Sequence, residues 1–250
     1  NELEVSSGAS IGIILYPQHA DNTESLLQGA DAALYKAKAD GRNTYSYYSD
    51  QLTALARERL VMEARLRYAV KHAQLQCYYH PQVDIITGAI VGAELLIRWF
   101  HPEYGMIPPA QFIPLAESCG LIHPIGHFVI QQACLQGKRW LEQGLPPIRL
   151  AVNVSAYQFS KGDLEQQIIT ALAQSQFPAH LLELEVTESA LMQDEETVIR
   201  TMQQLRAIGI RLAIDDFGTG YSSLAYLQRL PLDVLKVDRR FIDKITVNDE

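Results

Sequence analysis

The distribution of apolar residues along the chain predicts alternating strands and helices from about residue 76 onward. Short apolar runs typical of strands recur at 76–86, 89–99, 148–155, 181–187, 210–216 and 233–239. Segments with helical spacing of apolar residues separate the later runs, at 123–143, 160–175, 195–208 and 222–229. This succession favours a parallel sheet closed into a barrel. The predicted fold class is therefore α/β, a TIM-like (β/α) barrel.

Local signals refine this prediction. Ser160 is a candidate N-cap for the helix at 160–175, and Gly209 stands where the helix at 195–208 ends. Such a barrel has about eight strands, of which the chain supplies about six. We therefore expect a barrel that is incomplete at its C-terminus, in a chain that is a piece of a longer protein.

Residues 1–48 predict a short strand, a helix from about Thr23 that ends at Gly41, and a second short strand. These few elements cannot bury their own apolar faces, so we interpret 1–48 as the C-terminal end of another domain. An amphipathic helix follows at 50–75, interpreted as a linker that docks on the next domain, with a signalling coiled coil as the alternative. The predicted division is a domain end at 1–48, a linker helix at 49–59 and a second domain at 60–250.

Composition narrows the functional classes. The net charge of −8 argues against binding of a nucleic-acid polymer, which normally requires a basic face. Three cysteines without CxxC spacing favour a reducing, cytoplasmic compartment. We find no apolar run of membrane-spanning length and no signal peptide, although unseen parts of the parent protein could include a sensor domain or an inner-membrane anchor.

Each of the later apolar runs ends in a side chain that carries oxygen. These residues are Asn153, Glu185, the adjacent Asp215 and Asp216, and Asp238, and the earlier run at 89–99 carries Glu94. The C-terminal ends of barrel strands meet at one face, so we expect these residues to converge. Oxygen ligands without His or Cys suit Mg²⁺ or Mn²⁺ and not zinc. Lys236 lies at the same face and adds a charge that could orient a water or a phosphate oxygen.

A single Asp at the end of a strand is more often a turn residue or a helix cap than a metal ligand. The recurrence of oxygen-bearing residues at successive strand ends is what favours a metal site. Strand alternation sends Glu183 and Glu185 to the same side, so the pattern alone cannot decide which of them is the ligand.

Five ordered motifs within residues 60–250 resemble the EAL domain, a family of cyclic di-GMP phosphodiesterases. The segment GlyAlaGluLeuLeuIleArgTrp (92–99) is similar to the signature that names the family, with Leu95 where the family has Ala. The other four motifs are AlaValAsnValSerAla (151–156), LeuGluLeuGluValThrGluSer (182–189), AspAspPheGlyThrGlyTyrSerSerLeu (215–224) and LeuLysValAspArgArgPheIle (235–242).

The resemblance implies a role for each matching residue. Glu94, Asn153, Glu185 and Asp215 would bind one metal ion, while Asp216 and Asp238 would help to hold a second. Lys236 would hold or activate the attacking water, with Glu94 and Asp238 also in the catalytic set. Arg98 would contact a substrate phosphate, His80 stands where the family usually has a Gln near the guanine, and Glu188 would anchor the loop 217–224.

The activity that this resemblance implies is the hydrolysis of cyclic di-GMP to linear pGpG with two Mg²⁺ or Mn²⁺ ions. The alternatives are a receptor that binds cyclic di-GMP without cleaving it, and another barrel enzyme that uses Mg²⁺ on an enolate or aldol substrate. The family also suggests a homodimer formed through the region after loop 217–224, and it carries a further metal-binding Glu and a Gln that we expect beyond Glu250.

Residues 1–48 resemble the end of an α+β GGDEF domain, the diguanylate cyclase module. The similar segments are SerIleGlyIle (10–13), AlaAspAlaAlaLeuTyrLysAlaLys (30–38) and GlyArgAsn (41–43). The signature loop that names that domain would lie upstream of these segments. We therefore expect no cyclase activity from residues 1–48.

Overall fold

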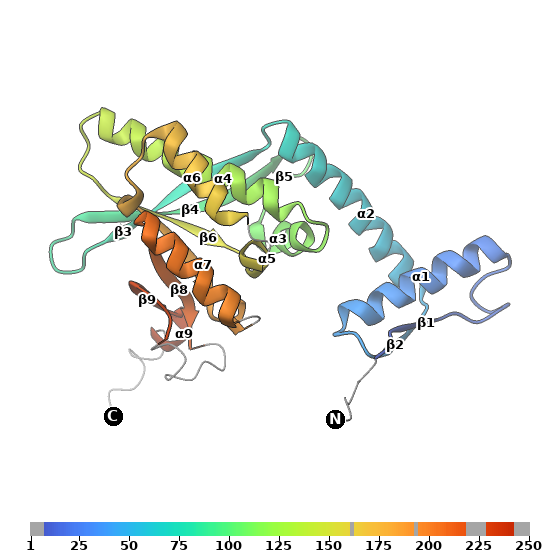
Figure 1. Cartoon of the computed structure of the whole chain (residues 1–250). Helices are drawn as coiled ribbons and strands as arrows, with labels where there is room; N and C mark the ends of the chain where they lie inside the picture. The colour runs from blue at the N-terminus through green and yellow to red at the C-terminus, as the bar shows by residue number, and fades with distance from the viewer. Residues whose placement is uncertain (1–7, 161–162, 193–194, 219–228, 243–250) are drawn as a thin grey trace, which may run out of the picture. The chain divides into compact units, whose positions relative to one another are not determined.

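The computed structural model describes residues 8–160, 163–192, 195–218 and 229–242 (Figure 1). The chain divides into two compact units, Asn1–Leu66 and Arg67–Glu250. Helix α2 (Asp50–Lys71) runs across this division without interruption. Apart from Ser49, the predicted linker at 49–59 and the predicted boundary at 60 therefore fall within one continuous helix, and their exact positions stay a prediction.

The described part of the first unit contains two short strands, a helix and most of α2. Strand β1 (Ile11–Ile13) pairs in parallel with β2 (Tyr45–Tyr47), and both contact helix α1 (Thr23–Ala39). The helix begins at a side-chain cap, because the Asn22 side chain accepts a hydrogen bond of 2.8 Å from the Ser25 amide. Strand β1 approaches the backbone of α1 through Gly12, where an added Cβ would lie 2.2 Å from the Ala30 carbonyl oxygen.

The second unit is built on a sheet whose described strands run in the order β3-β4-β6-β7-β8-β9. Their bounds are β3 (Leu75–Val83), β4 (Ile90–His101), β6 (Arg149–Val154), β7 (Leu182–Thr187), β8 (Arg211–Phe217) and β9 (Val234–Val237). From β4 to β9 every neighbouring pair is parallel, which confirms the predicted parallel α/β sheet. Residues 182–186 of the central strand β7 are all buried, as expected for a strand covered on both faces.

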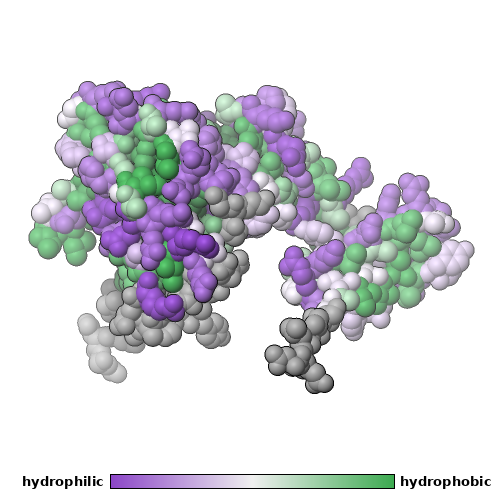
Figure 2. Space-filling view, viewed as in Figure 1, coloured by the Kyte–Doolittle hydropathy of each residue, from purple (hydrophilic) through white to green (hydrophobic). Residues whose placement is uncertain are grey.

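Strand β3 differs from these, because it pairs antiparallel with β4 in a hairpin, as the short strand β5 (Gly105–Ile107) also does. The Asp84 carboxylate shapes the turn by accepting hydrogen bonds from the amides of Ile86 and Thr87. A connection this short permits only antiparallel pairing, since parallel strands need a crossover of a dozen or more residues. The turn leaves Ile85 and Ile86 98% and 89% exposed, and the hairpin is green at its tip in Figure 2.

Helices cover the parallel strands. Helix α6 (Leu164–Ser175) lies between α4 (Ile122–Glu142) and α7 (Glu195–Ile208), and contacts both along the sheet (Figure 1). Shorter elements are α3 (Pro109–Ser118), α5 (Ala156–Ser160) and α9 (Arg239–Ile242), together with the 3₁₀ turns η1 (Ala179–Leu181) and η2 (Glu188–Met192). This alternation leaves the strand ends at one rim free to carry polar side chains.

Three expectations about elements need correction or limitation. The helix predicted from Ser160 begins at Leu164 with Asp163 as its N-cap residue, and Ser160 instead ends α5. Both Ser and Asp are capping residues, so composition could not choose between the two positions. Helix α3 and the short strand β5 were not predicted from the sequence. The helix predicted at 222–229 lies outside the described residues up to position 228.

We predict that Gly12→Ala loosens the first unit alone. The added Cβ would clash with the backbone carbonyl oxygen of Ala30, and rotation of a side chain moves neither atom. Strand β1 must therefore move away from α1. Hydrogen exchange followed by mass spectrometry should show faster exchange in peptides from residues 8–48. Peptides from β6 and β7 are the internal control. Unchanged exchange in residues 8–48 would contradict the close approach of β1 to α1.

Candidate active site

The register of the sheet brings the predicted acidic residues to one face. Glu94 on β4 pairs with Ala151 on β6, and Asn153 lies two residues further along the same strand. Asn153 in turn pairs with Glu185 on β7. Asp215 on β8 pairs with Thr187, two residues beyond Glu185. Because residues two apart in a strand share a face, the four side chains lie on the same side of the sheet.

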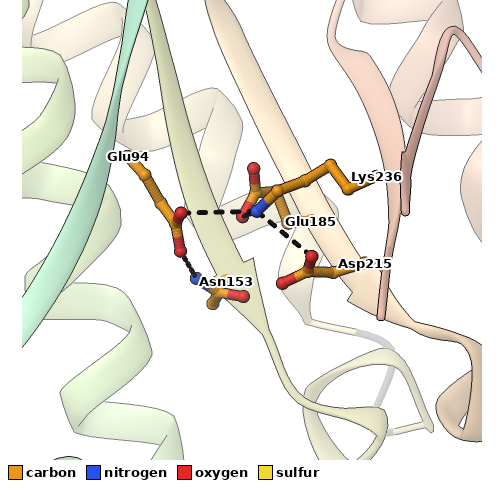
Figure 3. Close-up of polar contacts among 5 residues, drawn as sticks. All are labelled: Glu94, Asn153, Glu185, Asp215 and Lys236. Carbon is orange, nitrogen blue, oxygen red and sulfur yellow. Dashed lines mark hydrogen bonds and ion pairs between the residues drawn. The ribbon is translucent and has the colours of Figure 1, made fainter. Parts of the chain in front are cut away.

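Lys236 on β9 lies among three of these carboxylates (Figure 3). Its Nζ is 2.7 Å from Glu185 Oε2, 3.2 Å from Asp215 Oδ1 and 3.3 Å from Glu94 Oε2. Asn153 closes the arrangement, because its Nδ2 donates a hydrogen bond of 2.8 Å to Glu94 Oε1. One ammonium group therefore faces carboxylates from three other strands.

Glu185 is the most deeply buried member of this group, with a side chain that is 0% exposed. Burial raises the pKa of Glu185 to about 7, although the hydrogen bond and charge of Lys236 lower it. Burial also lowers the pKa of Lys236, but the three surrounding carboxylates outweigh that effect and raise it above its usual range. The second carboxylate oxygen of Glu185, Oε1, is buried without a hydrogen-bond partner. A buried, unpartnered carboxylate oxygen is an expected metal ligand, since its isolation is otherwise costly.

The arrangement fits a divalent cation. Glu94, Glu185 and Asp215 each offer an oxygen, and these oxygens all lie within 4.8 Å of one another. Asn153 contributes an amide, whose oxygen would face the group after a flip of the amide plane. Hard cations such as Mg²⁺ prefer such all-oxygen ligand sets. The structure also separates Glu185 from Glu183, because Glu183 pairs instead with Arg211 Nε at 3.4 Å.

The adjacent carboxylates on β8 are separated by an irregularity of the strand. The register of β8 against β9 shifts between Ile214 and Phe217, and Asp216 adopts a left-handed φ of 53°. A bulge of this kind redirects a side chain at the edge of an active site. Burial raises the pKa of Asp216, and the nearby charges of Asp215 and Asp238 raise it further. Asp216 thus interacts electrostatically with Asp215. It is not one of the three residues, Glu94, Glu185 and Asp215, whose oxygens lie within 4.8 Å of one another.

Asp238 lies apart from the cluster and contacts Arg240. Its Oδ1 accepts hydrogen bonds from the Arg240 amide at 2.7 Å and from Arg240 Nε at 3.0 Å. These bonds hold the pKa of Asp238 below its usual range. The Asp238 carboxylate therefore caps the start of α9 mainly through Oδ1, whereas Oδ2 has only a contact of 3.5 Å with Arg240.

The predicted substrate-binding residues flank the cluster. His80 on β3 pairs directly with Glu94 on β4, and directly opposed residues share a face of the sheet. Arg98 lies four residues after Glu94 on β4 and donates from a guanidinium nitrogen to the Ile97 carbonyl oxygen at 2.9 Å. Both residues therefore lie on strands that carry or adjoin the acidic group.

Glu188 follows β7 directly and is 2% exposed. Its Oε2 accepts a hydrogen bond of 3.0 Å from the Gly218 amide, at the start of the loop after β8. Gly218 has a φ of 94°, a conformation that favours glycine. Most of the predicted loop 217–224, from residue 219 on, lies outside the described residues, as does most of the region proposed for dimerisation.

A cavity of about 500 Å³ adjoins the acidic group. Arg98 and Asn153 line it, and Asn153 also contacts Glu94. Ile113 and Glu117 line it from α3, and Ile125 from α4. The sequence analysis missed this cavity because it predicted no element at α3, although Pro109 at the first position of that helix was an available signal.

Comparison with known protein families identifies both parts of the chain. Residues 63–250 match the EAL domain, and residues 1–44 match the diguanylate cyclase, GGDEF domain. Among solved structures, one described as the PaMucR phosphodiesterase in complex with c-di-GMP aligns with a TM-score of 0.71 and 44% identity. That alignment covers 74% of this chain and 75% of the other.

Curated relatives carry similar descriptions. The bifunctional diguanylate cyclase/cyclic di-GMP phosphodiesterase MucR of Pseudomonas aeruginosa is 45% identical over 97% of this chain. The cyclic di-GMP phosphodiesterase PdeR of Escherichia coli is 37% identical, also over 97% of this chain. The chain spans about a third of the length of these relatives, 35% and 36% respectively. Residues 1–44 thus match part of a GGDEF domain. Residues 63–250 of this chain belong to the EAL domain family, whose solved members have a TIM-like barrel fold.

Proposed function

We propose that the EAL domain of this chain hydrolyses cyclic di-GMP to linear pGpG with the help of divalent cations. The observation that carries this proposal is the convergence of Glu94, Glu185 and Asp215, from three strands, around a point where their oxygens lie within 4.8 Å of one another. Relatives described as cyclic di-GMP phosphodiesterases support the choice of substrate. Cyclic di-GMP is also present in the solved complex that aligns with this chain.

Glu94, Asn153, Glu185 and Asp215 would hold a first Mg²⁺ or Mn²⁺ ion. A second ion would lie beside Asp215, Asp216 and Asp238. Such ions supply Lewis-acid chemistry, since they lower the pKa of a bound water and neutralise charge on a phosphodiester. The orphaned Oε1 of Glu185 supports its assignment as a ligand. Lys236 then serves to position the attacking water, because its ammonium already lies within hydrogen-bonding distance of the ligand carboxylates.

The substrate would lie across the rim of the sheet. Arg98, which lines the cavity next to Asn153, is placed to bind a phosphate, for which a guanidinium is well suited. His80 would contact the substrate from the neighbouring strand β3. Glu188 would anchor the loop after β8 through its hydrogen bond to Gly218.

The setting of the domain is also a proposal. Among the described residues we find no helix that combines the length and the apolar character needed to cross a membrane. Cys77, Cys119 and Cys134 are free thiols, which supports a cytoplasmic location. We further propose that the domain forms homodimers through the region after loop 217–224 and receives input from an upstream sensor domain.

The pair Glu183 and Glu185 provides a matched test of the site. Both are buried glutamates on β7, but they pair with Arg211 and Lys236 respectively. We expect Glu185→Gln to lower the rate of pGpG formation at least about 100-fold, because Lewis-acid stabilisation is worth several kcal/mol. Glu183→Gln should leave the rate unchanged. The measurement is chromatography of pGpG with Mg²⁺ or Mn²⁺ present.

Three outcomes of this assay would count against the account. Equal losses in both variants would contradict the assignment of Glu185 as the ligand. Binding of cyclic di-GMP by the wild type without turnover would contradict the proposed hydrolysis and favour the receptor. Absence of binding as well would contradict cyclic di-GMP as the ligand.

A second prediction concerns Lys236→Met. Without added metal, this change leaves three carboxylates unneutralised and should cost about 1–3 kcal/mol of stability, because one side of a partly buried ion-pair network is removed. With Mn²⁺ added, we expect a larger rise in melting temperature than in the wild type, since the ion no longer competes with the ammonium. Differential scanning fluorimetry across a Mn²⁺ titration measures both effects. Weaker Mn²⁺ stabilisation in the variant would show that Lys236 assists the ion instead of competing with it.

A further inference from the structure

Glu117 is a carboxylic acid whose position is unfavourable for stability. It lies in the last turn of α3, where the helix dipole is negative, and no basic residue occupies that turn. Glu117 is half-buried, and its carboxylate makes no hydrogen bond or ion pair with any residue in the described part of the chain. Burial raises its pKa, and no neighbouring charge or hydrogen bond offsets that effect. A carboxylate whose desolvation is not offset by a partner is typical of a residue with a role in function.

The surroundings of Glu117 suggest what that function is. The cavity that it lines measures about 500 Å³, within the range of about 300–1,000 Å³ that small-molecule sites occupy. Apolar side chains, including Ile113, Ile125 and Val129, form much of its wall. Arg98 and Asn153 line it as well, and Asn153 contacts the ligand candidate Glu94. A dinucleotide with its phosphate at the acidic cluster can thus place a flat base in this cavity.

The chemistry of a carboxylate selects among the bases. The Watson–Crick edge of guanine presents two adjacent donors, N1–H and the 2-amino group, which match the two acceptor oxygens of a carboxylate. Adenine presents an acceptor, N1, beside its 6-amino donor, so a carboxylate would face a lone pair. Hypoxanthine keeps N1–H but lacks the 2-amino group.

We propose that Glu117 is the residue that selects guanine, by accepting hydrogen bonds from N1–H and the 2-amino group of one base of cyclic di-GMP. This inference rests on the proposed function. It adds to that function a specificity-determining contact, made from α3 and separate from the acidic residues that carry the chemistry. Glu117 would act on binding and leave the reacting phosphate untouched.

The test compares KM and kcat for cyclic di-GMP, cyclic di-IMP and cyclic di-AMP in the wild type and two variants. In the wild type, loss of the 2-amino group should raise KM about 10- to 100-fold, as expected for one hydrogen bond to a charged acceptor. Glu117→Ala should raise KM for cyclic di-GMP and leave kcat nearly unchanged, and within this variant KM should be the same for cyclic di-GMP and cyclic di-IMP. A purely structural role for Glu117 would preserve the preference for cyclic di-GMP.

Glu117→Gln provides a stricter test, because the amide presents one acceptor and one donor. The amide can pair with the 6-amino group and N1 of adenine, where the carboxylate faces a lone pair, whereas with guanine it loses the charged acceptor and the bond to the 2-amino group. The ratio of kcat/KM for cyclic di-AMP to that for cyclic di-GMP should therefore rise at least about 10-fold. Gln111→Ala, at an exposed position of the same helix, is the control and should keep the wild-type preference. Circular dichroism of each variant separates loss of fold from loss of specificity.

The outcomes distinguish the two proposals. Hydrolysis of cyclic di-GMP by the wild type, with equal KM for cyclic di-IMP, would overturn the role of Glu117 and leave the proposed function standing. Retention of base preference in a folded Glu117→Ala variant would do the same. Absence of hydrolysis in the wild type would overturn the proposed function and, with it, this inference.

Discussion

The ion pairs between Lys236 and carboxylates from three other strands are the interaction on which the site depends. Two like charges about 4 Å apart repel by about 4 kcal/mol at an effective dielectric constant of 20. One oxygen each of Glu94, Glu185 and Asp215 lies within 4.8 Å of the others, a separation at which the repulsion is still about 3 kcal/mol. The three carboxylates can therefore remain ionised together only beside a cation. The Lys236 ammonium meets that need in the protein alone, at 2.7–3.3 Å from all three. A divalent ion bound by the same oxygens would relieve the same repulsion.

The sheet makes this arrangement possible by keeping each carboxylate on a rigid strand. From one strand to the next across β4, β6, β7 and β8, the ligand candidate is either directly paired with the previous one or displaced from that pairing by two residues. Every ligand candidate therefore lies on the same face of the sheet. The irregularity in β8 then places Asp216 in a left-handed conformation, a backbone strain of the kind that accumulates at functional sites. Glu117 belongs to the same pattern, since its position also opposes stability. The proposed base specificity thus depends on helix α3, whereas the proposed chemistry depends on the strands that carry the acidic residues.

Sequence alone could predict the fold class and the convergence of acidic residues, because both follow from periodicity and from the parallel direction of the strands. It could not choose between Glu183 and Glu185, which share a face. That choice required the register of β8, which places Arg211 opposite Glu183. The orientation of Asp238 toward Arg240 depends on a local cap that competes with the metal-binding interpretation. Helix α3 was not predicted because Pro114 lies inside it, and a proline normally indicates the end of a helix.

The most direct test of the central claim is the anomalous diffraction of Mn²⁺ in crystals of the protein. The account predicts a manganese peak bounded by oxygens of Glu94, Glu185, Asp215 and Asn153, with the ammonium of Lys236 moved away from at least one of the carboxylates that it now contacts. Manganese bound only at positions away from these four residues would contradict it. So would the absence of bound manganese at saturating concentration, with Lys236 still paired to all three carboxylates.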